Sequence, residues 1–312
     1  MTLETNNKVL VIVGPTGVGK TQVAISIGQE LGSTIVNADS RQVYRYMDVG
    51  TAKPTETEIS SVPHQLIDIV DPDEEYNLAI FLQDSQRALG KLLEDSNARP
   101  MVVGGTGQYI WGLLENWQVP NVSPDLLLRQ KLEQLINDKG LATVAEQLNT
   151  IAPQLAASID LSNPRRVIRA MEIAKSGSMA NRVSPNANTS PYDYKIIGLT
   201  MPRQTLFSYI DQRVEVMIEN NWLGEVSSLL TRGYDVSLPS MSGIGYRELV
   251  EHLDNKLSLD EAVARIKTRT HRFVRTQYNW FKPKDPRIHW IDMTEAQSLD
   301  TAQNVVHSWI NS

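Results

Sequence analysis

The residues best suited to chemistry in this chain lie near its beginning, in the run GPTGVGKT at 14–21. The run matches the pattern G-x-x-x-x-G-K-[S/T], in which a glycine-rich loop opens a helix and turns backbone N–H groups toward phosphate oxygens. Its members are Gly14, Pro15, Thr16, Gly17, Val18, Gly19, Lys20 and Thr21. The Lys20 ammonium would neutralise a terminal phosphate, and the Thr21 hydroxyl would bind Mg²⁺. The motif therefore predicts a phosphate-bearing ligand with Mg²⁺, without naming the reaction.

A carboxylate, Asp39, follows the next apolar run of the sequence, at 33–37. In an open parallel sheet, ligands bind beyond the carboxyl ends of the strands, so we expect Asp39 to face the 14–21 loop across one edge. There it could bind Mg²⁺, act as a general base, or cap a helix, and the residue alone leaves these roles open. A further turn, GGTG at 104–107, should reach the same edge. Its Thr106 hydroxyl could contact a phosphate oxygen or simply cap a helix.

The elements that would position these residues alternate in type. Apolar, β-branched runs predict strands at 8–13, 33–37, 65–70 and 100–103, and helical spacing predicts helices at 21–31 and 77–94. Such βαβ units imply a parallel sheet. Later segments are predicted as helices over 124–175, a loop at 176–191, a strand at 195–200, helices over 203–282 and a strand at 287–291.

This pattern predicts an α/β fold with two parts. The first is a P-loop NTPase-like core with a parallel sheet, formed by residues 1–119 and 193–312. The second is a helical insertion domain at 120–192, where no strand pattern occurs.

Composition excludes several classes of protein. The chain has 312 residues, of which 41% are hydrophobic and 21% charged, as in ordinary globular proteins. The absence of cysteine excludes disulfides, thiolate catalysis and a cysteine-zinc site. Because neither a signal peptide nor a run of about 18 apolar residues occurs, we expect no membrane partner and a cytoplasmic location.

Charge is distributed unevenly along the chain. The formal net charge is −6, yet residues 262–290 carry eight basic side chains and one acid, a charge of +7, which leaves −13 elsewhere. Arg265, Arg269 and Arg272 follow at i, i+4 and i+7, so they would form one stripe on a helix. A basic stripe on an acidic protein favours a polyanionic partner, and a solvated helix face is the alternative.

Taken together, the motifs resemble the tRNA dimethylallyltransferase (tRNA isopentenyltransferase) family over most of the length. The matching segments are GPTGVGKT at 14–21, NADSRQVY at 37–44, MDVGTAKP at 47–54, VPHQLID at 62–68, VGGTGQY at 103–109, NPRRVIRAMEI at 163–173, GIGYREL at 243–249 and THRFVRTQYNWF at 270–281. The phosphate loop alone is unspecific, whereas the ordered set is highly specific. The sequence departs from the family pattern at Gln108, where leucine is common, and in SGSMANR at 176–182.

The resemblance implies a reaction. A dimethylallyl group passes from dimethylallyl diphosphate to the exocyclic amine of the adenine immediately 3′ of the anticodon, in tRNAs that read codons starting with U, and pyrophosphate leaves. The family's pattern makes Asp39 the general base, places Thr106 near the bridging oxygen, assigns Arg213 to the leaving group, and uses the phosphate loop and Mg²⁺ to hold the diphosphate. Judged from its neighbours alone, Arg213 would rather pair with Glu215 or Asp211 on a helix surface. The family also implies a monomer.

The resemblance further implies that the enzyme binds the tRNA anticodon stem-loop and extrudes the target base, as enzymes that modify stacked bases commonly do. The helical insertion would clamp the stem-loop. The candidate tRNA-binding residues are Ser40, Arg41, Gln42, Tyr44, Arg165, Arg166, Arg169, Gly245, Tyr246, Arg247, Arg269, Arg272 and Arg275.

Three other functions share some of these features. An adenylate isopentenyltransferase would use the same loop and Asp39, but a mononucleotide acceptor needs neither the insertion nor the basic helix. A small-molecule kinase would use Asp39 to bind an acceptor hydroxyl and arginines as a lid. A non-catalytic RNA-binding protein would not need an intact phosphate loop, and here the loop is intact.

Overall fold

The computed structural model describes residues 7–95, 97–120, 122, 124–177 and 190–312. The chain divides into two compact units, one formed by 1–114 with 190–312 and the other by 115–189. The sequence pattern predicts these boundaries at 119 and 193. Most of the predicted loop at 176–191 lies outside the described residues. None of the helices that the structure describes is long and apolar enough to cross a membrane.

The first unit is built on a six-stranded parallel sheet with the order β3-β2-β4-β1-β5-β6. Its strands are β1 (Lys8–Val13), β2 (Ile35–Asn37), β3 (His64–Gln65), β4 (Met101–Gly104), β5 (Asp193–Thr200) and β6 (Ile288–Asp292). Residues 9–13 of β1 are all buried, because helices cover both faces of a parallel sheet and leave it no polar side. The predicted α/β fold with a P-loop NTPase-like parallel sheet is therefore confirmed.

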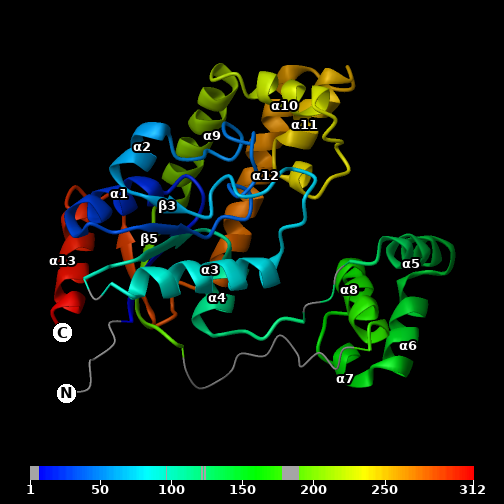
Figure 1. The fold of residues 1–312 in the computed structure, drawn as a ribbon. Coiled ribbons are helices and arrows are strands. Elements are labelled where there is room, and N and C mark those ends of the chain that lie inside the picture. Colours follow the sequence, from blue (N-terminus) through cyan, green and yellow to red (C-terminus); the bar gives the residue numbers. More distant parts are fainter. Residues whose placement is uncertain (1–6, 96, 121, 123, 178–189) are drawn as a thin grey trace. The chain divides into compact units, whose positions relative to one another are not determined.

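Among the described residues of the first unit, nine α-helices surround and extend this sheet, as Figure 1 shows. They are α1 (Lys20–Leu31), α2 (Glu56–Ser61), α3 (Leu78–Leu93), α4 (Gly107–Leu114), α9 (Arg203–Glu219), α10 (Trp222–Thr231), α11 (Tyr246–Leu253), α12 (Leu259–Trp280) and α13 (Ser298–Ile310). Local sequence sets several of their ends. Asn77 caps α3 by accepting the Ile80 N–H, and Ser258 forms a capping box with Glu261 at the start of α12.

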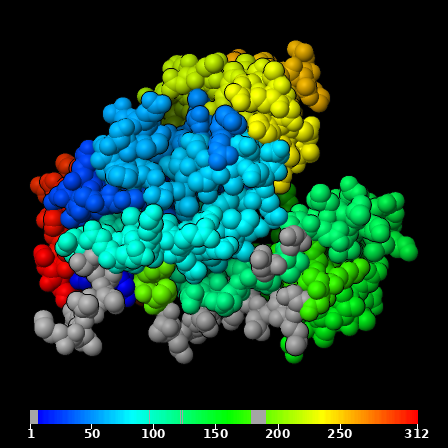
Figure 2. Space-filling model, in the orientation of Figure 1, coloured from blue at the N-terminus to red at the C-terminus, as the bar shows by residue number. Residues whose placement is uncertain are grey.

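Hydrophobic clusters stabilise the first unit, and two of them among the described residues bear on the site. One joins β1 and its neighbouring strands to α1 and α13, which lie side by side in Figure 1. The other joins α10, α11 and α12 around Trp222 and Tyr246, and includes Tyr44 and Met47 of the segment after β2. Figure 2 shows this segment, in light blue, against the yellow residues near 240, where Ser240 donates to the Pro72 carbonyl. The second cluster therefore anchors loops at the carboxyl edge of the sheet.

The second unit is helical and has a core of its own. Its helices are α5 (Leu126–Lys139), α6 (Leu141–Ile151), α7 (Pro153–Ala156) and α8 (Pro164–Lys175). Leu132, Val144, Leu148 and Val167 meet at its centre. Asn163 caps α8, and Pro164 occupies the first helical turn, where its missing N–H costs no hydrogen bond.

One predicted element is wrong in extent. The pattern predicts a strand over residues 65–70, but only His64–Gln65 pair with β2. Leu66 and Asp68 adopt φ angles of 63° and 54°, which no strand contains. The Asn37 side chain donates to the Leu66 carbonyl and stabilises this bend, and Val70 then makes an isolated bridge with Tyr44. The sequence pattern does not predict helices α2, α4 and α13 individually.

Candidate active site

The phosphate loop joins β1 to α1, as its motif requires, and curls around the Lys20 side chain. The Lys20 Nζ donates to the carbonyls of Gly14 (3.0 Å) and Pro15 (2.9 Å). Gly17 has a φ of 80°, and a Cβ placed on it would lie 2.9 Å from the Cγ1 of Ile210 in α9. Glycine is therefore required here both by backbone conformation and by the close packing of α9.

A second loop, after β4, lies against the residues that follow β2. The Ser40 N–H donates to the Thr106 hydroxyl oxygen at 3.1 Å, which leaves the hydroxyl proton for another acceptor. One carboxylate oxygen of Asp39 accepts the Arg41 N–H at 2.8 Å. A Cβ at Gly104 would lie 2.2 Å from the Ala38 carbonyl oxygen, so the two loops can approach this closely only with glycine there.

These loops border a cavity with two lobes. The phosphate lobe is lined by the loop from Thr16 to Thr21 and by polar side chains that include Asn37, Gln42 and His64. The second lobe, of about 330 Å³, is lined largely by apolar and aromatic side chains, among them Ile210, Val214, Trp222, Ile266 and Phe273. Four residues line both lobes: Thr16, Asp39, Thr51 and Arg213. The junction of the lobes is therefore where groups bound in each would meet.

The charges at this junction favour an anionic ligand. Burial lowers the pKa of Lys20 to about 8, while the Asp39 carboxylate acts to raise that pKa and Arg213 lowers it further. Burial also lowers the pKa of Arg213, against the opposing effect of Asp39. Two partly desolvated cations thus face one carboxylate, an arrangement that a phosphate or diphosphate would complement.

Comparison with known proteins decides the class of this site. A family model described as IPP transferase matches residues 42–284, and one described as Isopentenyl transferase matches residues 7–69. The chain belongs to the IPP transferase family. It is similar to the tRNA dimethylallyltransferase of Roseiflexus sp. strain RS-1, with 43% identity over 97% of this chain and 99% of that protein. A relative with the same name from Dehalococcoides mccartyi is 40% identical over 92% of this chain and 88% of its own.

Solved structures give the same family. The tRNA isopentenylpyrophosphate transferase of Bacillus halodurans superposes with a TM-score of 0.71 and 35% identity, over 98% of this chain and 96% of that one. A eukaryotic dimethylallyltransferase acting on tRNA superposes with a TM-score of 0.78 and 26% identity, over 97% and 78% of the two chains. This IPP transferase is therefore an enzyme of the same class.

Several predicted tRNA-binding residues of this IPP transferase are engaged within the protein. The Arg41 guanidinium donates to the carbonyls of Pro239 and Ser240 and to the Ser242 hydroxyl. The Gln42 amide donates to the carbonyls of Thr51 and Ala52.

The predicted aromatic contacts are also buried. Tyr44 is only 3% exposed within the second cluster. Tyr246, 1% exposed, donates to Glu225, and a Cβ at Gly245 would lie 2.0 Å from the Trp222 ring. Three of the predicted tRNA-binding residues line the second lobe: Ser40, Arg41 and Tyr246.

The predicted arginines fall into two groups. Arg247, Arg272 and Arg275 of the first unit and Arg165 and Arg166 of the second have exposed side chains. In contrast, Arg269 pairs with Glu248, and Arg169 binds Glu172 (3.1 Å) and the Val122 carbonyl (2.7 Å). Paired arginines are partly neutralised by their partners. We therefore expect the exposed arginines to bind a polyanion more strongly than the paired Arg169 and Arg269.

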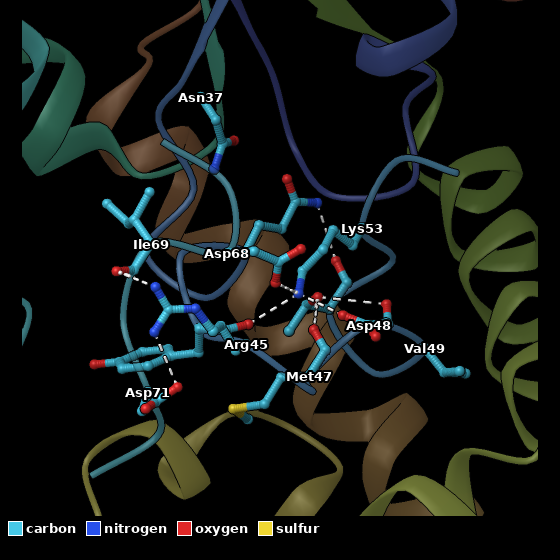
Figure 3. Close-up of polar contacts among 12 residues, drawn as sticks. Asn37, Arg45, Met47, Asp48, Val49, Lys53, Asp68, Ile69 and Asp71 are labelled. Atoms are coloured by element: carbon cyan, nitrogen blue, oxygen red, sulfur yellow. Dashed lines mark hydrogen bonds and ion pairs between the residues drawn. The ribbon is translucent and has the colours of Figure 1, made fainter. Parts of the chain in front are cut away.

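The structure adds positioning residues that spacing did not reveal. The side chain of Lys53, in the MDVGTAKP segment, is 4% exposed. It forms ion pairs with Asp48 and Asp68 and donates to the Tyr44 carbonyl (Figure 3). Glu225 of α10 accepts the N–H groups of Asp48, Val49 and Gly50. These contacts hold the loop that carries Thr51 into both lobes. The only sequence signal for Lys53 was its place in the MDVGTAKP segment, and Glu225 lies in none of the matching segments.

The residues present fit a magnesium ion bound together with a diphosphate. The Thr21 hydroxyl lines the phosphate lobe at the start of α1. Among the described residues, no group of three or more His, Asp or Glu side chains could hold a metal unaided. Mg²⁺ commonly binds through one or two protein oxygens plus substrate phosphates, so one hydroxyl beside a phosphate loop suits this ion.

Proposed function

We propose that this IPP transferase moves a dimethylallyl group from dimethylallyl diphosphate to the exocyclic amine of the adenine 3′-adjacent to the anticodon, in tRNAs that read codons starting with U. The observation that carries the proposal is the junction of the two lobes. One lobe suits a diphosphate and the other a flat, extruded base, and Asp39 and Arg213 lie where the two would meet. Curated relatives at about 40% identity are named for this activity.

Asp39 supports the proposal as a general base. An adenine amine is a weak nucleophile because its lone pair is delocalised into the ring, so removing its proton as the new bond forms accelerates attack. The bond from the amine nitrogen to the dimethylallyl carbon forms, the bond from that carbon to the bridging oxygen breaks, and Asp39 takes the amine proton. The Thr106 hydroxyl, with its proton unused, is suited to donate to the bridging oxygen.

The leaving pyrophosphate gains negative charge as the carbon–oxygen bond breaks. The backbone N–H groups of residues 17–21, the Lys20 ammonium and the Arg213 guanidinium would stabilise that charge in a partly desolvated site. Thr21 would hold Mg²⁺, which supplies further positive charge to the diphosphate when bound.

The exposed arginines support tRNA as the acceptor rather than a free nucleotide. Arg272 and Arg275 lie on α12, the helix that also lines the second lobe through Ile266 and Phe273. Arg165 and Arg166 lie on α8 of the second unit, which would bind the anticodon stem-loop. Lysine and arginine contacts to phosphates supply most of the affinity for nucleic acids, whereas a mononucleotide needs few of them.

A single-turnover assay tests this function. Purified enzyme, Mg²⁺ and radiolabelled dimethylallyl diphosphate are mixed with unmodified tRNA that carries adenine after its anticodon, or with AMP. We expect label in tRNA alone. Label in AMP alone would assign the adenylate-type reaction, and label in neither acceptor would reject prenyl transfer. A tRNA whose target adenine is replaced by guanine is the matched control and should stay unlabelled.

A further inference from the structure

The side chain of Gln277 joins the two loops that face the diphosphate. Its amide oxygen accepts the Thr16 N–H of the phosphate loop at 3.0 Å, and its amide nitrogen donates to the Gly105 carbonyl at 3.1 Å. The side chain is only 4% exposed. Both polar atoms of the amide therefore form hydrogen bonds with backbone groups that are distant in the sequence. Among the described residues, no other side chain forms hydrogen bonds with both of these loops.

The fit around Gly105 is close on several sides. A Cβ at this position would lie 2.4 Å from the Gln277 amide nitrogen, 3.3 Å from the Gly14 carbonyl oxygen and 3.5 Å from the Lys20 Nζ. The phosphate loop, the Thr106 loop and α12 thus converge at one point. Gln277 takes the Thr16 N–H, which leaves the N–H groups of residues 17–21 to point at phosphate oxygens.

Helix α12 is held firmly where Gln277 projects from it. Trp280, one turn later, accepts a hydrogen bond from the Trp111 indole on its carbonyl at 3.0 Å. Its side chain lies 2.3 Å from where a Cβ on Gly107 would be. Helix α4 begins at Gly107, directly after Thr106. Residues of α12 therefore contact the Thr106 loop on both sides of Thr106: Gln277 at Gly105 and Trp280 at Gly107. The opposite side of this helix carries the exposed Arg272 and Arg275.

We propose that Gln277 is a positioning residue that sets the separation of the phosphate loop and the Thr106 loop, so that one diphosphate contacts both in register. The proposal deepens the proposed function and rests on it for the identity of the donor. Preorganised loops bind a ligand without first being ordered, and small displacements of catalytic groups reduce rates strongly. Gln277 acts through these loops and touches no reacting atom.

The test compares Gln277→Met with Tyr278→Phe. Methionine keeps the shape of the side chain and removes both hydrogen bonds. The control removes one partly buried hydrogen bond from the next residue of α12, where the Tyr278 hydroxyl lies 2.8 Å from the Thr200 hydroxyl at the end of β5. This bond does not involve the backbone of Thr16 or Gly105, which Gln277 contacts. Two quantities are measured: affinity for magnesium pyrophosphate by titration calorimetry, and kcat/KM for dimethylallyl diphosphate.

We expect Gln277→Met to bind pyrophosphate about tenfold more weakly and to lose roughly 100-fold in kcat/KM for dimethylallyl diphosphate. Tyr278→Phe should stay within about twofold in both assays. Pyrophosphate affinity unchanged in Gln277→Met, or lowered equally in the control, would overturn the positioning role. If Gln277→Met does not fold, Gln277→Leu replaces it, since leucine also removes both hydrogen bonds without adding a charge beside the diphosphate site, and the same affinity loss is expected.

The two proposals fail in different ways. If the parent enzyme binds pyrophosphate with the expected dependence on Gln277 but transfers no label to tRNA, the prenyl-transfer function is wrong and the positioning role stands. If the parent transfers label and Gln277→Met binds pyrophosphate normally, only the positioning role is wrong.

Discussion

Replacing Lys20 by methionine should stabilise the unliganded protein while it removes activity. Burial lowers the pKa of Lys20 from 10.5 to about 8, and at about 1.4 kcal/mol per pH unit this shift corresponds to about 3.5 kcal/mol of cost for keeping the charge at neutral pH. In the variant, the carbonyls of Gly14 and Pro15 each lose the hydrogen bond from Lys20. Each lost bond costs about 1 kcal/mol of stability and reduces the gain from removing the buried charge. We therefore expect a net gain of about 1–2 kcal/mol at pH 7.

The pH dependence of this difference identifies its cause. Between pH 8 and 10.5 the unfolded chain holds a proton on Lys20 that the native protein has released. Stability of the parent protein therefore rises with pH over this range, by the linkage between proton binding and folding. Lys20→Met lacks this dependence, so its stability advantage over the parent should shrink from pH 8 upward and change sign before pH 10.5, because the parent gains about 3.5 kcal/mol over this range. Lys20→Arg keeps its charge from pH 7 to 10.5. The difference in free energy of unfolding between Lys20→Arg and Lys20→Met should therefore not change with pH.

Urea unfolding followed by tryptophan fluorescence measures the gap, without diphosphate or Mg²⁺. Five of the six tryptophans lie in the first unit, which contains the phosphate loop, so the signal reports the relevant unit. A gap between parent and Lys20→Met that is the same at pH 7 and pH 10 would refute the buried-charge argument. A variant less stable than the parent at pH 7 would show that the hydrogen bonds to the two carbonyls outweigh the desolvation of the ammonium.

Three further changes probe the site and its supports. Asp39→Asn should lower kcat by about 10²–10⁴ while tRNA affinity stays within about twofold, and near-normal turnover would remove Asp39 from the role of base. The double variant Arg272→Ala, Arg275→Ala should weaken tRNA binding and reduce the slope of log affinity against log salt by about 2, whereas Arg265→Ala, whose parent side chain already pairs with Glu251, should change that slope less. Glu225→Gln should lower the free energy of unfolding by about 1–3 kcal/mol, because the carboxylate accepts hydrogen bonds from three consecutive N–H groups and from the Tyr246 hydroxyl. An unchanged free energy of unfolding in chemical denaturation would show that Glu225 does not stabilise the 48–50 loop.

Most of the sheet could be predicted because its signals are local. Residues 9–13 and 101–104 are continuous apolar runs, each followed by glycine, and a buried parallel strand needs little more information than this. Residues 65–70 carry the same signal in Ile69 and Val70, yet the chain bends there. The bend depends on Asn37 and on the ion pair of Asp68 with Lys53, and these contacts come from other segments. Tertiary contacts therefore decided against local propensity.

The same distinction separates the parts of the candidate site. The spacing of the phosphate loop and the carboxyl-edge rule were enough to place Lys20, Asp39 and Thr106 at one edge of the sheet. Helical spacing also put Arg265, Arg269 and Arg272 on one stripe. It could not show that acids on α11 neutralise Arg265 and Arg269 and leave Arg272 exposed. Gln277 lies in the THRFVRTQYNWF segment that resembles the family, but its partners could not be predicted, because a glutamine on a basic helix has no preferred partner until the loops are in place.

Buried positive charge at this site is only partly compensated while no diphosphate is bound. Without a ligand, Lys20 and Arg213 keep their protons against desolvation; the Asp39 carboxylate offsets part of that cost for both, and the Gly14 and Pro15 carbonyls offset part of it for Lys20. A bound diphosphate would supply the missing negative charge, so donor binding would raise the pKa of Lys20 and stabilise the loop. Above pH 8 the unliganded Lys20 becomes neutral and its attraction for the diphosphate weakens. Alkaline pH should thus stabilise the empty protein and reduce donor affinity at the same time, two opposite effects that follow from one ammonium group.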